Sequence, residues 1–452
     1  MSSPTGALLV IRAFQLTLPR AAAGWLFALL TSNFNRIAIY ELGITAALVT
    51  TLLGLYHFLS PFEVVYGRLA DRIPILGRHR SPYVFLGMLL SACAVAALPA
   101  IVVPMSQDPH SIFGIAFPYA SYTAGFLVLT LFGIGFSMAG SNHLALVAEV
   151  MPEHTRGLVT ALIWTMMILG MILSLVFIRS YMPDYDHAKM QSLYILSIPV
   201  VGGLVFLGIL GVEPHSKHRR AVRKSHTEKP HASLREFAVA CSKDSAVRNF
   251  FCYIFLFMFG YSLQNNIIEV FGAQVLGMTV GETGRFQQIW GSGAIVGMFA
   301  MGAMVFRGGM NKRTAITIGI SGIGAALFLL AYGSLQADSD LVNVSLILMG
   351  FSNGLALVGT LTSMMEFSTD AERGAYIGIW GMSIAFASGF SSIASGQLVT
   401  ALIESGLMYP SNGFAAIFAL EALITLSSLW FLLRVKHRCF DAVPTATASG
   451  AV

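Results

Sequence analysis

The stretch "GRLADRIPILGRHRSPY", Gly67 to Tyr83, places four arginines and one aspartate between two long apolar runs. The 452-residue chain around it is 56% hydrophobic and 11% charged, with a mean hydropathy of +0.73. Soluble domains carry roughly a quarter charged residues, so this composition predicts an integral membrane protein. The net charge of +5 by itself says little about nucleic acid, and for a membrane protein of this composition we expect no nucleic-acid partner.

Apolar runs predict the number of membrane spans. A helix needs about 20 apolar residues to cross a bilayer. Twelve runs of suitable length lie at 20–40, 44–66, 81–103, 122–148, 157–181, 190–212, 249–271, 284–306, 313–335, 340–365, 374–402 and 412–434. We therefore expect an all-α integral membrane fold with twelve transmembrane helices, preceded by an amphipathic segment at 1–19.

The basic residues predict the orientation in the membrane. They gather at the N-terminus, around 67–80, in 213–248 and in the segments near 307–313, 373 and 434–438, whereas the opposite connections hold only Arg179, Lys189 and Arg285. Cytoplasmic loops carry the excess of Lys and Arg. The pattern predicts that both termini are cytoplasmic.

Two matched motifs indicate an internal duplication. "EVMPEHTRG" (149–157) follows the fourth predicted span and "EFSTDAERG" (366–374) follows the tenth, at an offset of 217 positions. Each follows a Gly-rich span with a central Asn, which favours two six-helix pseudo-repeats. We expect one half at 20–212, a basic cytoplasmic linker at 213–248, a second half at 249–435, and a C-terminal tail at 436–452.

The opening stretch resembles the loop motif of the major facilitator superfamily (MFS), roughly G-x-x-x-D-R-x-G-R-R. At Gly67 we expect a close helix crossing, and Asp71 can cap a helix N-terminus and pair with arginine. The resemblance implies a charged latch at the cytoplasmic gate. Its candidate residues are Gly67, Asp71, Arg72, Arg78, Arg80, Glu149, Arg156, Glu366 and Arg373.

Three segments narrow the resemblance. "LLTSNFNRIAIYELGI" (29–44), the loop motif with its flanks (60–87), and "LQNNIIEVFGAQVLGMTVGETGRF" (263–286) are similar to the PucC/LhaA, or bacteriochlorophyll-delivery, family of the MFS. That resemblance implies a protein of the bacterial inner or photosynthetic membrane that holds or delivers chlorophyll or bacteriochlorophyll. The implied partners are membrane lipid, light-harvesting or photosystem apoproteins, and pigment-synthesis enzymes.

Two histidines inside spans are candidate pigment ligands. The magnesium of a chlorophyll takes an axial ligand, commonly a neutral imidazole, so the protein itself would bind no metal directly. His57 has the aromatic neighbours Tyr56 and Phe58, and His143 lies in the fourth span. Each histidine could equally form a hydrogen bond to a neighbouring helix.

Polar residues at mid-span are the remaining binding candidates, chiefly Asn33, Gln264 and Asn265. Such residues either contact cargo or hydrogen-bond between helices. The span interiors look nearly free of acids, with Glu269 expected near the outer rim. This favours holding over proton-coupled pumping, although a proton-coupled secondary transporter of an amphipathic small molecule stays open. The aspartates lie in loops on opposite faces, so we expect no Mg-diphosphate site, no catalytic residues and no enzyme.

Overall fold

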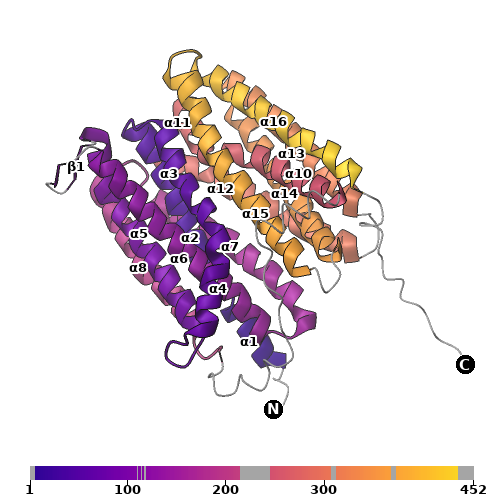
Figure 1. The fold of residues 1–452 in the computed structure, drawn as a ribbon. Coiled ribbons are helices and arrows are strands. Elements are labelled where there is room, and N and C mark those ends of the chain that lie inside the picture. Colours follow the sequence, from indigo (N-terminus) through magenta and orange to yellow (C-terminus); the bar gives the residue numbers. More distant parts are fainter. Residues whose placement is uncertain are drawn as a thin grey trace, which may run out of the picture.

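The computed structural model describes residues 6–108, 110–112, 115–116, 119–213, 245–306, 312–367 and 373–435, and nearly all of them are helical (Figure 1). The exception is a short antiparallel hairpin, β1 (Ser111–Ile112) and β2 (Ile115–Ala116), in which Ser111 pairs with Ala116. In Figure 1 this hairpin and helix α4 lie at opposite ends of the first half. We call these the hairpin end and the arginine end; which of them faces the cytoplasm stays a prediction.

The helices before residue 213 form what we call the first half. They are α1 (Gly6–Gln15), α2 (Leu18–Phe27), the π-helical turns η1 (Ala28–Phe34) and η2 (Ile37–Glu41), α3 (Ala46–Leu59), the 3-10 turn η3 (Ser60–Phe62), α4 (Glu63–Arg72), α5 (Ser81–Gln107), α6 (Ala120–Val150), α7 (Glu153–Tyr181) and α8 (His187–Ile209). Local sequence signals determine where several of these helices begin. Pro82 stands in the first turn of α5, where its missing N–H costs nothing, and Asp186 caps α8 by accepting from the Lys189 N–H at 3.0 Å.

The helices after residue 244 form the second half. They are α10 (Ser245–Ser262), the 3-10 turn η6 (Leu263–Asn266), α11 (Ile268–Gln274), α12 (Val280–Phe306), α13 (Lys312–Gln336), α14 (Ser339–Phe367), α15 (Arg373–Val399), the π-helical turn η7 (Thr400–Glu404) and α16 (Pro410–Arg434). The exact bounds of the two halves, the linker and the tail stay predictions, because 214–244 and 436–452 lie outside the described residues.

Helix is present at each of the twelve predicted span positions. Within the described residues, ten helical segments are long and apolar enough to cross a membrane, and the bent pair Ala46–Phe62 and Val65–Arg72 would make an eleventh. The remaining predicted span, 284–306, is the eighth in order and lies in α12, a helix of 27 residues that packs against α7 and α14. The chain is therefore a multi-pass membrane protein, as predicted.

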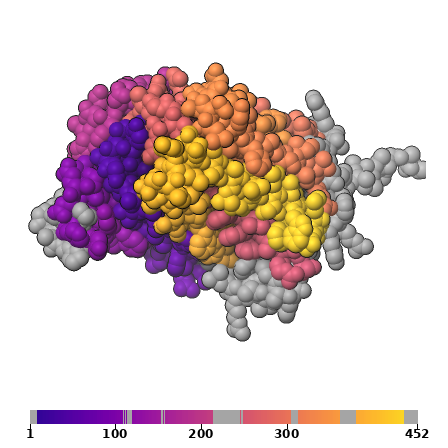
Figure 2. All heavy atoms as spheres, turned by 90° about the horizontal axis from the view of Figure 1, so that it is seen from above, coloured from indigo at the N-terminus to yellow at the C-terminus, as the bar shows by residue number. Residues whose placement is uncertain are grey.

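The two halves lie side by side, the first in indigo to magenta and the second in orange to yellow (Figure 2). They meet mainly where α3 packs on α15 and α7 on α12. The crossing of α3 and α15 is close because Gly396 has no side chain; a Cβ there would collide with Thr50 and lie 2.5 Å from the Ala46 carbonyl oxygen. Small residues that let backbones approach are the usual basis of helix packing in membranes.

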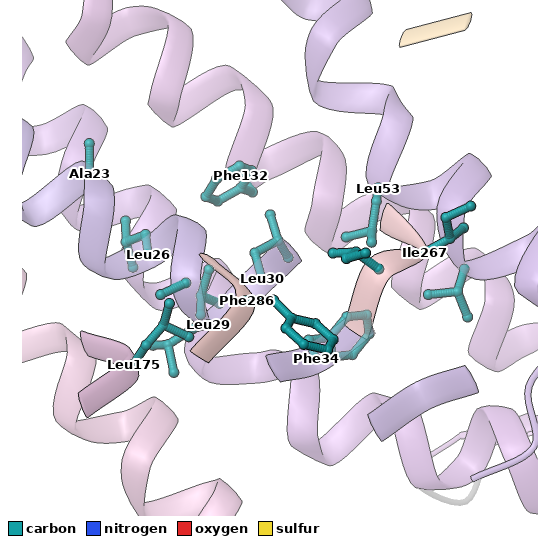
Figure 3. Close-up of a cluster of buried hydrophobic side chains, with 14 of the residues drawn as sticks. Ala23, Leu26, Leu29, Leu30, Phe34, Leu53, Phe132, Leu175, Ile267 and Phe286 are labelled. Atoms are coloured by element: carbon teal, nitrogen blue, oxygen red, sulfur yellow. The ribbon is translucent and has the colours of Figure 1, made fainter. Parts of the chain in front are cut away.

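Both helices that begin a half are irregular. The first span changes from α-helix to the π-helical turns η1 and η2, and the seventh is interrupted by the 3-10 turn η6. Buried side chains from the first half, such as Leu30 and Phe34, pack there with Ile267 and Phe286 of the second half (Figure 3). Interrupted helices of this kind often mark binding sites in transport proteins.

Candidate functional site

A central cavity lies between the two halves, beside the irregular first and seventh spans. It encloses about 790 Å³ of empty space, part of it open to solvent. The first half contributes Gly24, Phe27, Thr31, Tyr56, His57, Met167, Ile168 and Met171, and the second half contributes Ser262, Asn265, Asn266, Gln287, Trp290, Ser388 and Ser392. The two walls differ: one is largely apolar and aromatic, and the other is built mainly from hydroxyl and amide groups. Such a cavity suits an amphipathic ligand.

His57 is the histidine that the structure places in this cavity. Neither of its ring nitrogens has a hydrogen-bond partner among the described residues, and its ring lies against Tyr56 with centroids 3.9 Å apart. The His57 side chain is half-buried, so its ring nitrogens can face either water or a ligand in the cavity. Its role as a pigment ligand stays a prediction.

The two aromatic neighbours of His57 point to different places. Tyr56 belongs to a cluster of rings with Phe27, Phe132 and Phe136, at centroid distances between 5.0 and 6.5 Å. Phe58 instead packs against α15, 5.2 Å from Phe390. Tyr56 and Phe58 therefore do not form two sides of one slot around His57.

The polar residues of the seventh span connect the cavity wall to the rest of the interface. The side chain of Gln264 donates to Asn265 at 2.7 Å, and Asn265 lines the cavity. Asn266 donates to Ser392, and Asn35 of the first half donates to the Asn266 carbonyl. The helix-bonding role is therefore present at Asn266, whereas contact with cargo stays a prediction for the residues that line the cavity.

Asn33 and His143 lie in packing contacts away from the cavity lining. The Tyr194 hydroxyl donates to the Asn33 side-chain oxygen at 3.0 Å. His143 Nε2 lies 2.7 Å from the Leu16 carbonyl, which only accepts, so Nε2 carries the proton. Its Nδ1 is buried and has no partner within the described residues. The geometry favours the helix-bonding interpretation of His143.

A second candidate site is the charged cluster at the arginine end, centred on Arg80. Its guanidinium contacts Asp71 at 2.7 Å and Glu149 at 3.1 Å, and donates to Asn142 at 3.1 Å and to the Gly67 carbonyl at 3.2 Å. Arg80 is 8% exposed. All of these partners belong to the first half, so the described contacts tie α4, α5 and α6 together rather than joining the two halves.

The other residues expected in the latch are placed differently. The close helix crossing expected at Gly67 is not found among the described residues, where a Cβ would meet no atom within 4 Å. Arg72 is exposed, Arg78 makes no side-chain hydrogen bond within the described part of the chain, and Arg156 donates to the Met151 carbonyl at 3.2 Å. Of the arginines expected to face carboxylates here, Arg80 is the one paired with a carboxylate within the described part of the chain.

Glu213 completes the cluster, and the sequence patterns did not point to it. Its carboxylate accepts the backbone N–H groups of His79 at 2.7 Å, Arg80 at 3.0 Å and Ser81 at 2.6 Å. These N–H groups precede or begin α5 and have no partner in its helical ladder. The capping role expected for Asp71 is therefore carried out at this helix by Glu213, which lies more than 130 residues away in the chain.

Two acids inside the second half are fully buried, each 0% exposed. Glu269 accepts from Gln287 at 3.1 Å, and Glu421 accepts from the backbone N–H of Gln264 at 3.3 Å. Glu269 was expected near the outer rim, and Glu421 was not among the residues expected to matter. The one sequence signal for Glu421 is that it is a lone acid within the apolar run of α16.

The matched acid and arginine of the second half, Glu366 and Arg373, lie at the ends of α14 and α15, and their side chains are outside the described residues. The same holds for the basic segment 214–244. Among the described residues, no group of three or more His, Cys, Asp and Glu could hold a metal ion.

Residues 33–440 match the protein family described as PUCC protein. The chain belongs to this family. Protein PucC of Rhodovulum sulfidophilum is 28% identical to it over 381 residues, which cover 84% of this chain and 82% of that protein. The bacteriochlorophyll synthase 44.5 kDa chain of Rhodobacter capsulatus is 25% identical over 449 residues, or 97% and 98% of the two chains.

The fold of this PUCC protein is that of the MFS transporters. The crystal structure of a D-xylose-proton symporter superposes with a TM-score of 0.68, covering 93% of this chain and 97% of that one at 16% identity. At such low identity the likeness concerns the fold alone. The fold is thus one that membrane transport proteins share.

Proposed function

We propose that this protein binds a chlorophyll- or bacteriochlorophyll-type pigment in the central cavity and delivers it to light-harvesting or photosystem apoproteins during assembly of their complexes. The observation that carries the proposal is His57, a histidine without a hydrogen-bond partner among the described residues, on the wall of a cavity between the two halves. The name of the Rhodobacter capsulatus relative, a bacteriochlorophyll synthase chain, supports this class of ligand.

The donor set fits such a pigment. The macrocycle supplies four nitrogens to its magnesium, so one axial imidazole is sufficient and no cluster of protein ligands is needed. His57 would supply that nitrogen.

The opposite wall would orient the ligand. Ser262, Asn265 and Gln287 offer amide and hydroxyl groups to the carbonyl substituents of a macrocycle. Phe27 and Tyr56 offer apolar ring surface on the other side. In this proposal the protein is not an enzyme. It receives the pigment from pigment-synthesis enzymes and passes it to the apoproteins.

The test is an absorption spectrum of the protein purified in mild detergent from a pigment-making host. We expect pigment at a fixed ratio to protein through a size-exclusion column, and a loss of tenfold or more in His57→Ala. The matched control is His187→Ala, on the exposed first turn of α8. Equal pigment in all three proteins would remove His57 from the site, and a colourless parent protein of normal stability would contradict stable pigment binding.

The second candidate function is a proton-coupled secondary transporter of an amphipathic small molecule. The observation that favours it is the pair of fully buried acids, Glu269 and Glu421, because ionisable groups inside spans are costly and commonly serve proton relays. Cargo-driven acidification in sealed vesicles, abolished by changing either acid to Gln, would support transport. Pigment binding without any proton movement would favour holding and delivery.

A further inference from the structure

Glu421 lies near mid-depth in a membrane span. It is eleven residues from the start of α16 at Pro410 and thirteen from its end at Arg434. Its side chain is 0% exposed. A carboxyl group in this position is excluded from water and from lipid headgroups alike, so its charge state depends on its immediate neighbours.

The groups around the Glu421 carboxyl provide little stabilisation for a negative charge. One carboxyl oxygen accepts the Gln264 N–H at 3.3 Å, and the other has no hydrogen-bond partner among the described residues. Arginine and lysine residues within the described part of the chain form no ion pair with it. The hydroxyl of Thr425, one turn along α16, is also buried without a partner there.

Within the described part of the chain, the elements packed around α16 place no cation against Glu421, and Arg248 of α10 forms no ion pair with it. On α10, the titratable residue that interacts with Glu421 is Tyr261, which is neutral when protonated. Ionisable residues described on α11, α13 and η7 make no described contact with it; they are Glu269, Arg313, Tyr332 and Glu404. The described part of α15, from Trp380 to Val399, has no ionisable residue. A carboxylate buried without a counter-ion is strongly unfavourable, whereas the neutral acid is tolerated.

A short path joins this carboxyl group to the central cavity. Glu421 bonds the backbone of Gln264 within the 3-10 turn η6, and the Gln264 side chain donates to Asn265 at 2.7 Å. Asn265 lines the cavity. Any change in the bond between Glu421 and Gln264 therefore acts on a residue that would contact the ligand.

We propose that Glu421 is a proton-binding site that couples its proton to the occupancy of the central cavity through Gln264 and Asn265. In the conformation described here the carboxyl group carries the proton. When the ligand shifts the η6 turn so that cavity water reaches Glu421, the carboxyl O–H bond breaks, that water accepts the proton, and the carboxylate strengthens its bond to the Gln264 N–H. The proton site stands without the proposed function, whereas its coupling to pigment rests on it.

Infrared spectroscopy of the purified, pigment-free protein tests the proton site directly. A protonated carboxyl group has a carbonyl stretching band that an ionised one lacks. We expect such a band at neutral pH in the parent protein, its loss in Glu421→Gln, and no loss in Glu404→Gln, whose carboxyl is exposed at the hairpin end. Glu421→Asp keeps the carboxyl group, so it should shift the band rather than remove it. This variant allows the band to be assigned if Glu421→Gln does not fold. An unchanged band in Glu421→Gln would overturn the proposal.

A pH-indicator dye in weak buffer then tests the coupling. Addition of bacteriochlorophyll should release about one proton per bound pigment from the parent protein and none from Glu421→Gln. Pigment binding without proton release would overturn the coupling and leave pigment binding intact. The infrared band without any pigment binding would support the proton site and contradict the proposed function, so the two failures are distinguishable.

Discussion

The carboxylate of Glu213 accepts the backbone N–H of Ser81 at 2.6 Å, so a residue just beyond α8 holds the first turn of α5. Two further N–H groups, those of His79 and Arg80, bond the same carboxylate. A single acid thereby satisfies donors that the helix cannot satisfy itself. The adjoining Arg80 cluster depends on the same loop being held in place.

Replacing Glu213 with Ala should therefore lower the stability of the protein by about 1–2 kcal/mol, the usual effect of losing a helix cap. Thermal unfolding in detergent, followed by intrinsic fluorescence, measures the change. Asp184→Ala, in the exposed loop between α7 and α8, is the matched control and should unfold like the parent. Equal unfolding temperatures for parent and Glu213→Ala would show that the cap contributes nothing.

Arg80→Met should be more damaging than Arg78→Met, two residues away in the same loop. Removing the Arg80 guanidinium leaves Asp71 and Glu149 without their cation. Both carboxylates are partly exposed, at 40% and 31%, so the loss of the two ion pairs and of the Asn142 hydrogen bond should cost about 1–2 kcal/mol. Arg78 makes no side-chain hydrogen bond among the described residues, so its replacement should be nearly neutral. Denaturation of both variants in detergent gives the comparison; similar losses in the two would argue against the cluster.

Asp71→Asn tests whether the cluster also acts as a latch. The Asp71 side chain is 40% exposed, so the lost ion pair should cost no more than about 1 kcal/mol and leave the protein folded. We expect the variant to shift the balance between the two access states. Thiol labelling of single cysteines placed at the arginine end and at the hairpin end reads out that balance. Labelling rates identical to those of the parent at both ends would contradict the latch.

Gly396→Val should force α3 and α15 apart and weaken the contact between the halves. A Cβ at Gly396 meets Thr50 and backbone atoms of Ala46, which cannot move aside as a flexible side-chain tip could. The expected loss is about 1–3 kcal/mol, typical of overpacking. Gly381→Val on the same helix is the control, because a Cβ there meets no described atom within 4 Å. Unfolding temperature is the readout, and equal effects of the two variants would refute the close crossing.

The sequence by itself determined where the membrane helices lie. Long apolar runs specify spans directly, because each must bury about 20 residues in hydrocarbon whatever its neighbours are. The Gly-to-Arg loop motif and the segments around Asn33 and Gln264 were also sufficient to indicate the family, which the match over residues 33–440 confirms. These signals are local in the chain, so they needed no knowledge of the packing.

The tertiary structure alone decided which polar residues meet. His57 and His143 look alike in sequence, yet one lines a cavity and the other bonds the Leu16 carbonyl. Glu213 reaches the start of α5 from the end of α8, and Glu421 reaches η6 from α16. Helix crossings and rotations bring these groups together across 120 to 160 residues of chain. Apolar periodicity does not specify such rotations, because lipid and helix neighbours are equally apolar and the packing of small residues selects the contact face.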